Sequence, residues 1–107
     1  MKSDWHRLLQ FAASTGHKDL AALSLNQGVP VDAALEGGKT ALVVAAESGS
    51  LGVVLLLLMR GARVGALRAF TAASAEGHDA VVRELRTLAV AELDAPVRWL
   101  KTRLYAQ

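Results

Sequence analysis

A five-residue pattern recurs along the chain and constrains its fold more than any other feature. Ala12–Gly16 reads AASTG, and Ala45–Gly49, 33 residues later, reads AAESG. A third copy, Ala73–Gly77, reads ASAEG and follows after 28 residues. A period of about 20–50 residues is typical of repeat proteins, in which each unit buries its apolar side on its neighbours. The 107 residues are therefore expected to form a single domain built as an array of three small units.

Each unit is expected to be a pair of short helices. In the best-formed unit an apolar run starts at Ala41 and stops at Ser48-Gly49, and a second run, Leu51–Met59, is closed by Gly61. A glycine directly after an apolar run is typical of a helix C-terminus. Helices of this length are not stable alone in water, so the units must stack. The predicted units are residues 5–33, 38–66 and 67–89, with a C-terminal capping helix at 93–107.

The central unit resembles the ankyrin repeat, whose pattern is roughly G-x-T-P-L-H-x-A-A-x-x-G-H-x-x-x-V-x-x-L-L-x-x-G-A. The matching residues are Gly38, Thr40, Leu42, Ala45, Ala46, Gly49, Val54, Leu57, Leu58, Gly61 and Ala62. No unit carries the histidine of the Thr-Pro-Leu-His tetrapeptide, which is Thr40-Ala41-Leu42-Val43 in the centre. The resemblance implies an all-α, ankyrin-type helical repeat solenoid that binds other proteins and uses no cofactor.

The segments between and beyond the units give further expectations. Asp32–Lys39 is long enough for the β-hairpin finger that joins ankyrin units, and Gly37-Gly38 suits its turn. The second finger is five residues shorter. Asp4 is expected to cap a first helix that ends at Ser14. The third unit has Glu84 and Arg86 where the central unit has Leu56 and Leu58; these positions are expected to face a following repeat, so their polarity predicts the end of the array.

Composition excludes several classes of protein. The chain has no cysteine, which excludes disulfides and thiolate metal sites and fits a reducing cytoplasm. The longest apolar run, Val53–Met59, is far shorter than the roughly 20 residues of a membrane span, and the N-terminus lacks the apolar run of a signal peptide. We therefore expect a soluble protein. Twelve basic against ten acidic residues give no general attraction to nucleic acid.

Three motifs offer other chemistry, and each also has a structural reading. Ala33–Thr40 ends like a phosphate-binding P-loop, but Ala33 stands where that loop needs glycine. His17 and His78 occupy one position of the repeat, and neither they nor His6 have partners for a metal or for catalysis at a suggestive spacing. The last quarter is basic through Arg83, Arg86, Arg98, Lys101 and Arg103, which leaves nucleic-acid binding as the alternative function. We favour a solvated capping face, no metal and no enzymatic activity.

The resemblance implies a binding surface on the fingers and on the inner face of the first helices. In register with the repeat, the inner-face candidates are Phe11, Ser14, Thr15, Val44, Glu47, Ser48, Ala75 and Glu76, and the finger candidates are Leu35, Glu36 and Lys39. Phe11 and Val44 are expected to supply apolar contact, and the two glutamates to orient the partner.

A second candidate surface lies on the second helix of the central unit. Leu51, Leu55 and Met59 are spaced four residues apart and therefore share one helical face. These positions are usually polar and exposed in the repeat, so we call the three residues the outer stripe. An apolar stripe of this kind is expected to meet a partner protein or a second copy, or to be covered by another part of the chain.

The sequence therefore predicts a cytoplasmic protein-interaction module whose partner is another protein. Nucleic-acid binding through the basic C-terminal helices is one alternative. A structural scaffold without a dedicated partner is the other.

Overall fold

The computed structural model describes residues 2–90 of the chain. The helices α1 (Lys2–Thr15) and α2 (Lys18–Asn26) form a first pair, and α3 (Ala41–Ser48) and α4 (Leu51–Met59) form a second. α3 and α4 have the bounds that the sequence predicts. α1 starts earlier than expected, so that Asp4 lies in its first turn and does not precede it as a cap.

A third pair completes the described part of the chain. It consists of α5 (Ala66–Ala75) and the helical segment at residues 79–90. The only other element among the described residues is a 3-10 turn, η1 (Glu36–Gly38), and they contain no strand. The all-α repeat architecture is confirmed, and the capping helix predicted for 93–107 lies outside the described residues. No helix in the described part is long and apolar enough to cross a bilayer.

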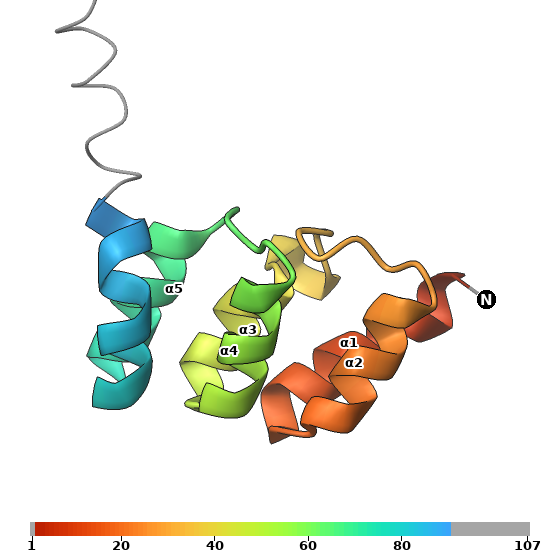
Figure 1. Cartoon of the computed structure of the whole chain (residues 1–107), viewed down its shortest axis with the longest axis horizontal. Helices are drawn as coiled ribbons and strands as arrows, with labels where there is room; N and C mark the ends of the chain where they lie inside the picture. The colour runs from red at the N-terminus through yellow and green to blue at the C-terminus, as the bar shows by residue number, and fades with distance from the viewer. Residues whose placement is uncertain (1, 91–107) are drawn as a thin grey trace, which may run out of the picture.

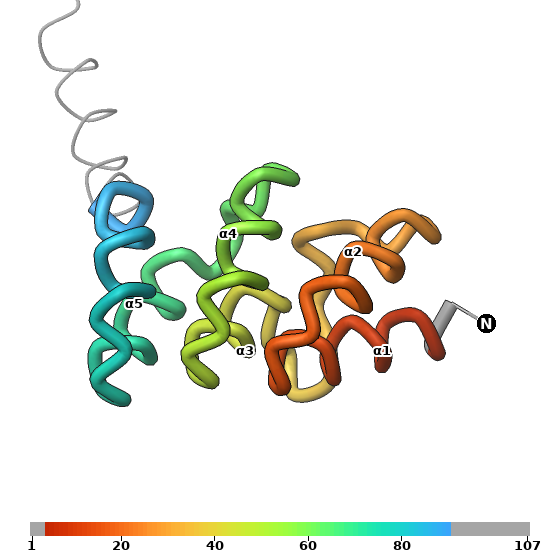
Figure 2. Tube along the Cα trace, turned by 60° about the horizontal axis from the view of Figure 1, so that its bottom comes forward, coloured from red at the N-terminus to blue at the C-terminus, as the bar shows by residue number. Residues whose placement is uncertain are grey.

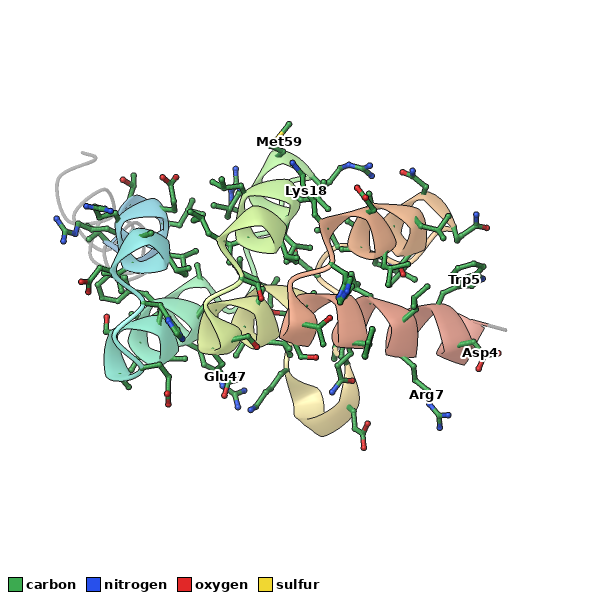
Figure 3. The ribbon with its side chains drawn as sticks, turned by 90° about the horizontal axis from the view of Figure 1, so that it is seen from below. Asp4, Trp5, Arg7, Lys18, Glu47 and Met59 are labelled. Atoms are coloured by element: carbon green, nitrogen blue, oxygen red, sulfur yellow. The ribbon has the colours of Figure 1, made fainter. Side chains whose placement is uncertain are left out.

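The helix pairs stand side by side in a single row (Figure 1). Each pair is a hairpin closed by a tight turn, and the pairs follow one another in chain order (Figure 2). α1, α3 and α5 lie in one layer, whose members we call the inner helices. α2, α4 and the segment 79–90 lie in the other, whose members we call the outer helices (Figure 3).

The hairpin turns explain the recurring five-residue pattern. The residue after each glycine donates its backbone N–H to the carbonyl of the alanine five positions earlier, and the glycine takes a left-handed conformation that closes the helix. These bonds are His17 to Ala12 (3.0 Å), Ser50 to Ala45 (2.9 Å) and His78 to Ala73 (2.9 Å). The alanines are fully buried where the two helices of a pair meet, so a larger side chain would separate them.

The loop after the first pair differs from the predicted hairpin. It leaves α2 at Gln27 and reaches α3 after Thr40, and its tip is the single turn η1. The N–H of Leu35 donates to the carbonyl of Lys39 at 2.8 Å, and the N–H of Gly38 donates to the carbonyl of Leu35 at 3.0 Å. These two bonds close a compact loop without a β-ladder. We keep the name finger for residues 32–39.

The loop after the second pair is much shorter, as predicted. Only Arg60–Gly65 separates α4 from α5. α5 also starts at Ala66, three positions before Ala69, the residue that matches the start of α3. The positions that form the finger in the first loop are therefore either absent from the second loop or part of α5.

Candidate functional site

The inner helices present short polar side chains at the ends nearest the hairpin turns. Glu47 lies on α3 in the inner layer (Figure 3). Its neighbours in the repeat register, Ser14 and Thr15 on α1 and Ala75 on α5, are exposed, as are Ser48 and Glu76. Successive inner helices therefore offer matching side chains along the row, as the sequence predicts for the inner face.

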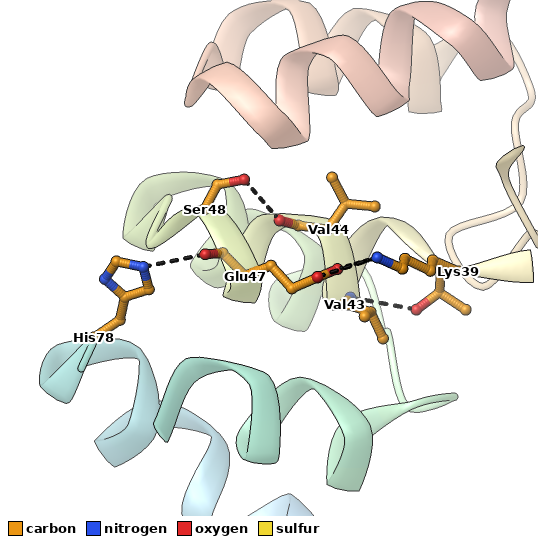
Figure 4. A network of polar contacts seen from close by, with 7 residues as sticks. Lys39, Val43, Val44, Glu47, Ser48 and His78 are labelled. Atoms are coloured by element: carbon orange, nitrogen blue, oxygen red, sulfur yellow. Dashed lines mark hydrogen bonds and ion pairs between the residues drawn. The ribbon is translucent and has the colours of Figure 1, made fainter. Parts of the chain in front are cut away.

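One ion pair connects the finger to the inner face. Lys39 Nζ lies 2.9 Å from Glu47 Oε1 and 3.0 Å from Oε2, and both side chains are a little over one-third exposed (Figure 4). An ion pair this exposed contributes only about 0–1 kcal/mol, so it orients the finger more than it stabilises the fold. The ion pair also engages the carboxylate of Glu47, which the sequence analysis expects to orient a partner protein. Glu36 and Glu76 are exposed acidic groups on this surface.

His78 joins the second and third pairs. Its Nε2 lies 3.1 Å from the carbonyl oxygen of Glu47, and its ring covers the backbone of Gly49 (Figure 4). A Cβ on Gly49 would lie 2.6 Å from the Nδ1 of His78, which leaves no room for a side chain. His78 therefore has a structural role at the boundary between two repeats.

His17 occupies the same place in the first unit, without a preceding unit in the described residues. It contacts the hydroxyl of Thr15, and its ring stacks on Phe11 with 5.7 Å between ring centroids and 17° between ring planes. Phe11 remains 52% exposed. An apolar contact offered by Phe11 is therefore compatible with the structure.

Two of the predicted site residues are wrong as contact residues because their side chains are buried. Leu35 is 7% exposed, since the compact finger turns it toward the core. Val44 is 9% exposed and points toward α1 (Figure 4), where it fills the space between the first two inner helices. Glu36 at the finger tip is exposed, and Lys39 is partly exposed.

The outer stripe is graded in exposure. Met59 is 82% exposed and lies on the side of the molecule away from the finger (Figure 3), and Leu55 is 37% exposed. Leu51 is partly buried and packs against the core, so it does not belong to the free surface as expected. The exposed part of the outer stripe is therefore its C-terminal end.

The residues of the P-loop-like segment have structural roles. Thr40 is 6% exposed; its hydroxyl accepts the N–H of Val43 at 3.5 Å and donates to the carbonyl of Val64 at 3.3 Å. Thr40 is thus the N-cap of α3. Lys39 is paired with Glu47. Among the described residues no group of three or more histidine and carboxylate side chains lies close enough to hold a metal.

Two hollows lie beside α1. One of about 310 Å³ lies near the start of α1 and is lined by Trp5, His6, Gln27, Gly28, Val29 and Pro30. The other, about 420 Å³ and more open, separates α1 from the finger and is lined by His6, Arg7, Gln10, Ala34, Leu35 and Glu36. The Oε1 of Gln10 accepts the N–H of Glu36 at 3.3 Å across this second hollow, which holds the finger beside α1.

Comparison with known families agrees with this repeated helix-hairpin geometry. The family model described as ankyrin repeats (3 copies) matches residues 2–68. The chain belongs to the ankyrin repeat family. The ankyrin match covers the first two helix pairs and the start of α5, and the third pair departs from the 33-residue spacing. No curated protein matches the chain.

Sequence reasoning missed the polar contacts that connect consecutive ankyrin units. Asp32 Oδ1 accepts the backbone N–H groups of Arg63 at 3.1 Å and Val64 at 3.2 Å, so one finger residue holds the next loop. The side chain of Arg60 donates to Asn26 Oδ1 at 2.9 Å between the outer helices. The repeat pattern gives no signal for Asp32, because the matching residue in the second loop is Gly65, which has no side chain to make such a contact.

Proposed function

We propose that this ankyrin repeat chain is a non-enzymatic cytoplasmic module that binds another protein through its inner face and finger. The observation that supports the proposal most directly is the run of exposed side chains at the C-terminal ends of three successive inner helices: Ser14, Thr15, Ser48, Ala75 and, directly after α5, Glu76. Their backbones are fixed by the stack, so a partner does not have to order them on binding.

The chemistry of the surface favours a partner with hydrogen-bond donors or basic side chains. Glu36 on the finger and Glu76 after α5 are exposed carboxylates, and Ser14 and Ser48 are exposed on α1 and α3. Phe11 adds an aromatic side chain at one edge. A few such groups within a polar rim are typical of protein interfaces.

The absence of cysteine from the sequence suits a reducing compartment. The exposed part of the outer stripe, Leu55 and Met59, stays a predicted second contact for a partner.

Affinity capture from the source cell, followed by mass spectrometry, tests the inner face. We expect Ser14→Arg with Glu76→Arg to lose the proteins that wild type captures, because both side chains are exposed on the inner face and the change reverses its charge. The matched control is Thr87→Arg with Glu84→Arg, which adds the same charge to exposed positions of the outer segment 79–90. The control should capture as wild type does. If the inner-face variant also captures the same proteins, the inner face is not the binding surface.

A further inference from the structure

The second hollow, between α1 and the finger, carries charges of both signs. Arg7 lies on its α1 wall and Glu36 on its finger wall. Arg7 points from α1 toward the side on which the finger stands (Figure 3). Both side chains are exposed, and within residues 2–90 neither the guanidinium nor the carboxylate forms a hydrogen bond or an ion pair. The two walls therefore offer a cation and an anion that are both open to a partner.

The neighbouring charged side chains are already engaged. Lys39, the cation nearest to Glu36 along the finger, is held by Glu47 at 2.9 Å (Figure 4). His6 also lines the hollow and has an interaction of its own. A partner that pairs with Arg7 and Glu36 therefore does not compete with an existing ion pair.

The two walls are fixed relative to each other before any partner binds. The Oε1 of Gln10, one turn after Arg7 on α1, accepts the N–H of Glu36 at 3.3 Å. Leu35 is 7% exposed and anchors the finger beside this bond. Because the oxygen of Gln10 is used, its Nε2 amide keeps N–H donors that suit a backbone carbonyl of a partner. A site whose walls are already ordered spends little free energy on ordering them during binding.

The pair of opposite charges excludes simpler occupants. A phosphate or another anion beside Arg7 would be repelled by Glu36, and a metal cation beside Glu36 would be repelled by Arg7. A peptide with charges of one sign meets the same conflict on one wall. The hollow of about 420 Å³ lies within the roughly 300–1,000 Å³ of typical ligand sites. Its occupant therefore needs both signs of charge within a short length.

We propose that this hollow binds an extended segment of the partner protein in which an acidic and a basic residue are separated by one residue. The acidic side chain pairs with Arg7, the basic one with Glu36, and a backbone carbonyl between them accepts from Gln10. Alternate side chains of an extended chain lie on one face about 6.5–7 Å apart. Arg7 lies about 5 Å along the helix axis before Gln10, the residue that holds the finger, so this spacing suits the two walls.

The proposal rests on the proposed function, because the hollow lies between an inner helix and the finger, and it names the chemistry of the segment bound there. Charges at such an exposed site select the partner and its orientation more than they add affinity. The acidic and basic residues of the segment therefore have a fixed order along its chain.

Selection of a phage-displayed library of random short peptides on the full chain tests the occupant. We expect enriched peptides to carry an acidic and a basic residue separated by one residue, in one order. In fluorescence anisotropy, Arg7→Glu and Glu36→Arg should each bind a selected peptide about fivefold or more weakly, because an exposed ion pair is replaced by a repulsion. Their circular dichroism spectra should be unchanged, since both side chains are exposed.

The double variant Arg7→Glu with Glu36→Arg gives the sharpest result. It exchanges the charges of the two walls and leaves Gln10 in place, so it should enrich peptides with the opposite order of acidic and basic residues. A merely structural role of the two side chains would not reverse this order. Arg68→Glu, at the matching position of α5, and Glu84→Arg, on the segment 79–90, change exposed charges that do not line the hollow. Both controls should bind the wild-type peptide unchanged.

Three results would overturn the proposal. The first is that the selected peptides lack the charge pair, and the second is that the double variant enriches the same order as wild type. The third is displacement of the peptide by excess free glycine, which would assign the hollow to a small zwitterion.

Affinity capture distinguishes this proposal from the proposed function. If Ser14→Arg with Glu76→Arg loses the captured proteins and Arg7→Glu with Glu36→Arg retains them all, the hollow is not the partner's seat and the inner face is. If the order of charges reverses as expected and Ser14→Arg with Glu76→Arg still captures the same proteins, the hollow stands and the inner-face proposal fails.

Discussion

Gly49→Ala perturbs one tight contact at the boundary between the second and third units. Gly49 has φ of +72°, in the left-handed region where an added Cβ costs about 1–2 kcal/mol. The new methyl group would also lie 2.6 Å from His78 Nδ1 and 2.9 Å from its Cγ, so the imidazole must move. Moving it breaks the 3.1 Å contact of His78 Nε2 with the Glu47 carbonyl, a bond of the kind worth about 0.5–1.5 kcal/mol. We expect a total loss of about 2–4 kcal/mol in the free energy of unfolding.

Gly77→Ala is the matched control, because it measures the cost of placing a Cβ in the left-handed backbone conformation without the clash with His78. Gly77 closes α5 at φ of +75°, and an added Cβ there meets no atom within 4 Å. This variant should lose only the backbone cost of about 1–2 kcal/mol. Urea unfolding followed by far-ultraviolet circular dichroism gives both free energies, and an unchanged slope against urea shows that the two-state comparison holds.

A double-mutant cycle isolates the contact with the imidazole. His78→Ala removes the ring, so adding Gly49→Ala to it should cost only the backbone term. The two changes together should therefore destabilise by less than the sum of the single changes. The reasoning is refuted if Gly49→Ala and Gly77→Ala cost the same within about 0.5 kcal/mol, or if the cycle shows no coupling.

Three further outcomes follow from the structure. Leu57→Ala truncates a fully buried side chain of the central unit and should cost about 2–5 kcal/mol in a single unfolding step; an unchanged melting temperature would contradict this. Leu55→Glu with Met59→Lys changes the exposed end of the outer stripe and should alter stability by less than about 0.5 kcal/mol, measured by urea unfolding, while weakening any capture that uses the stripe. Duplex and single-stranded DNA should bind weakly or not at all in a fluorescence titration; submicromolar, salt-sensitive binding that Arg98→Ala with Arg103→Ala abolishes would favour the nucleic-acid alternative.

The sequence predicts the repeat and most helix bounds because both depend on local physics. A glycine that closes a helix and alanines that let two helices approach are readable from the five-residue pattern alone. For this reason α4 begins and ends where its apolar run does, and α3 begins with its apolar run and ends just before Gly49. α5 was harder to delimit, because Gly65 starts it where a finger would otherwise continue.

The site was less predictable, because exposure depends on which neighbour covers a residue. Val44 and Phe11 have the same place in the repeat, yet only Val44 lies between two inner helices. Leu35 reads as a finger residue, but the backbone bonds of the finger turn it inward. Leu51 belongs to the same helical face as Met59 by spacing, while its position at the start of α4 brings it against the core.

The finger at residues 32–39 has a consequence for how a partner can be aligned. A row of similar helix pairs is nearly symmetric under translation, so a partner that contacts only the inner helices can slip by one unit at little cost. In the described part of the chain a finger follows the first pair, and only Arg60–Gly65 follows the second. Any partner that contacts both the finger and the inner helices is thereby held in one register.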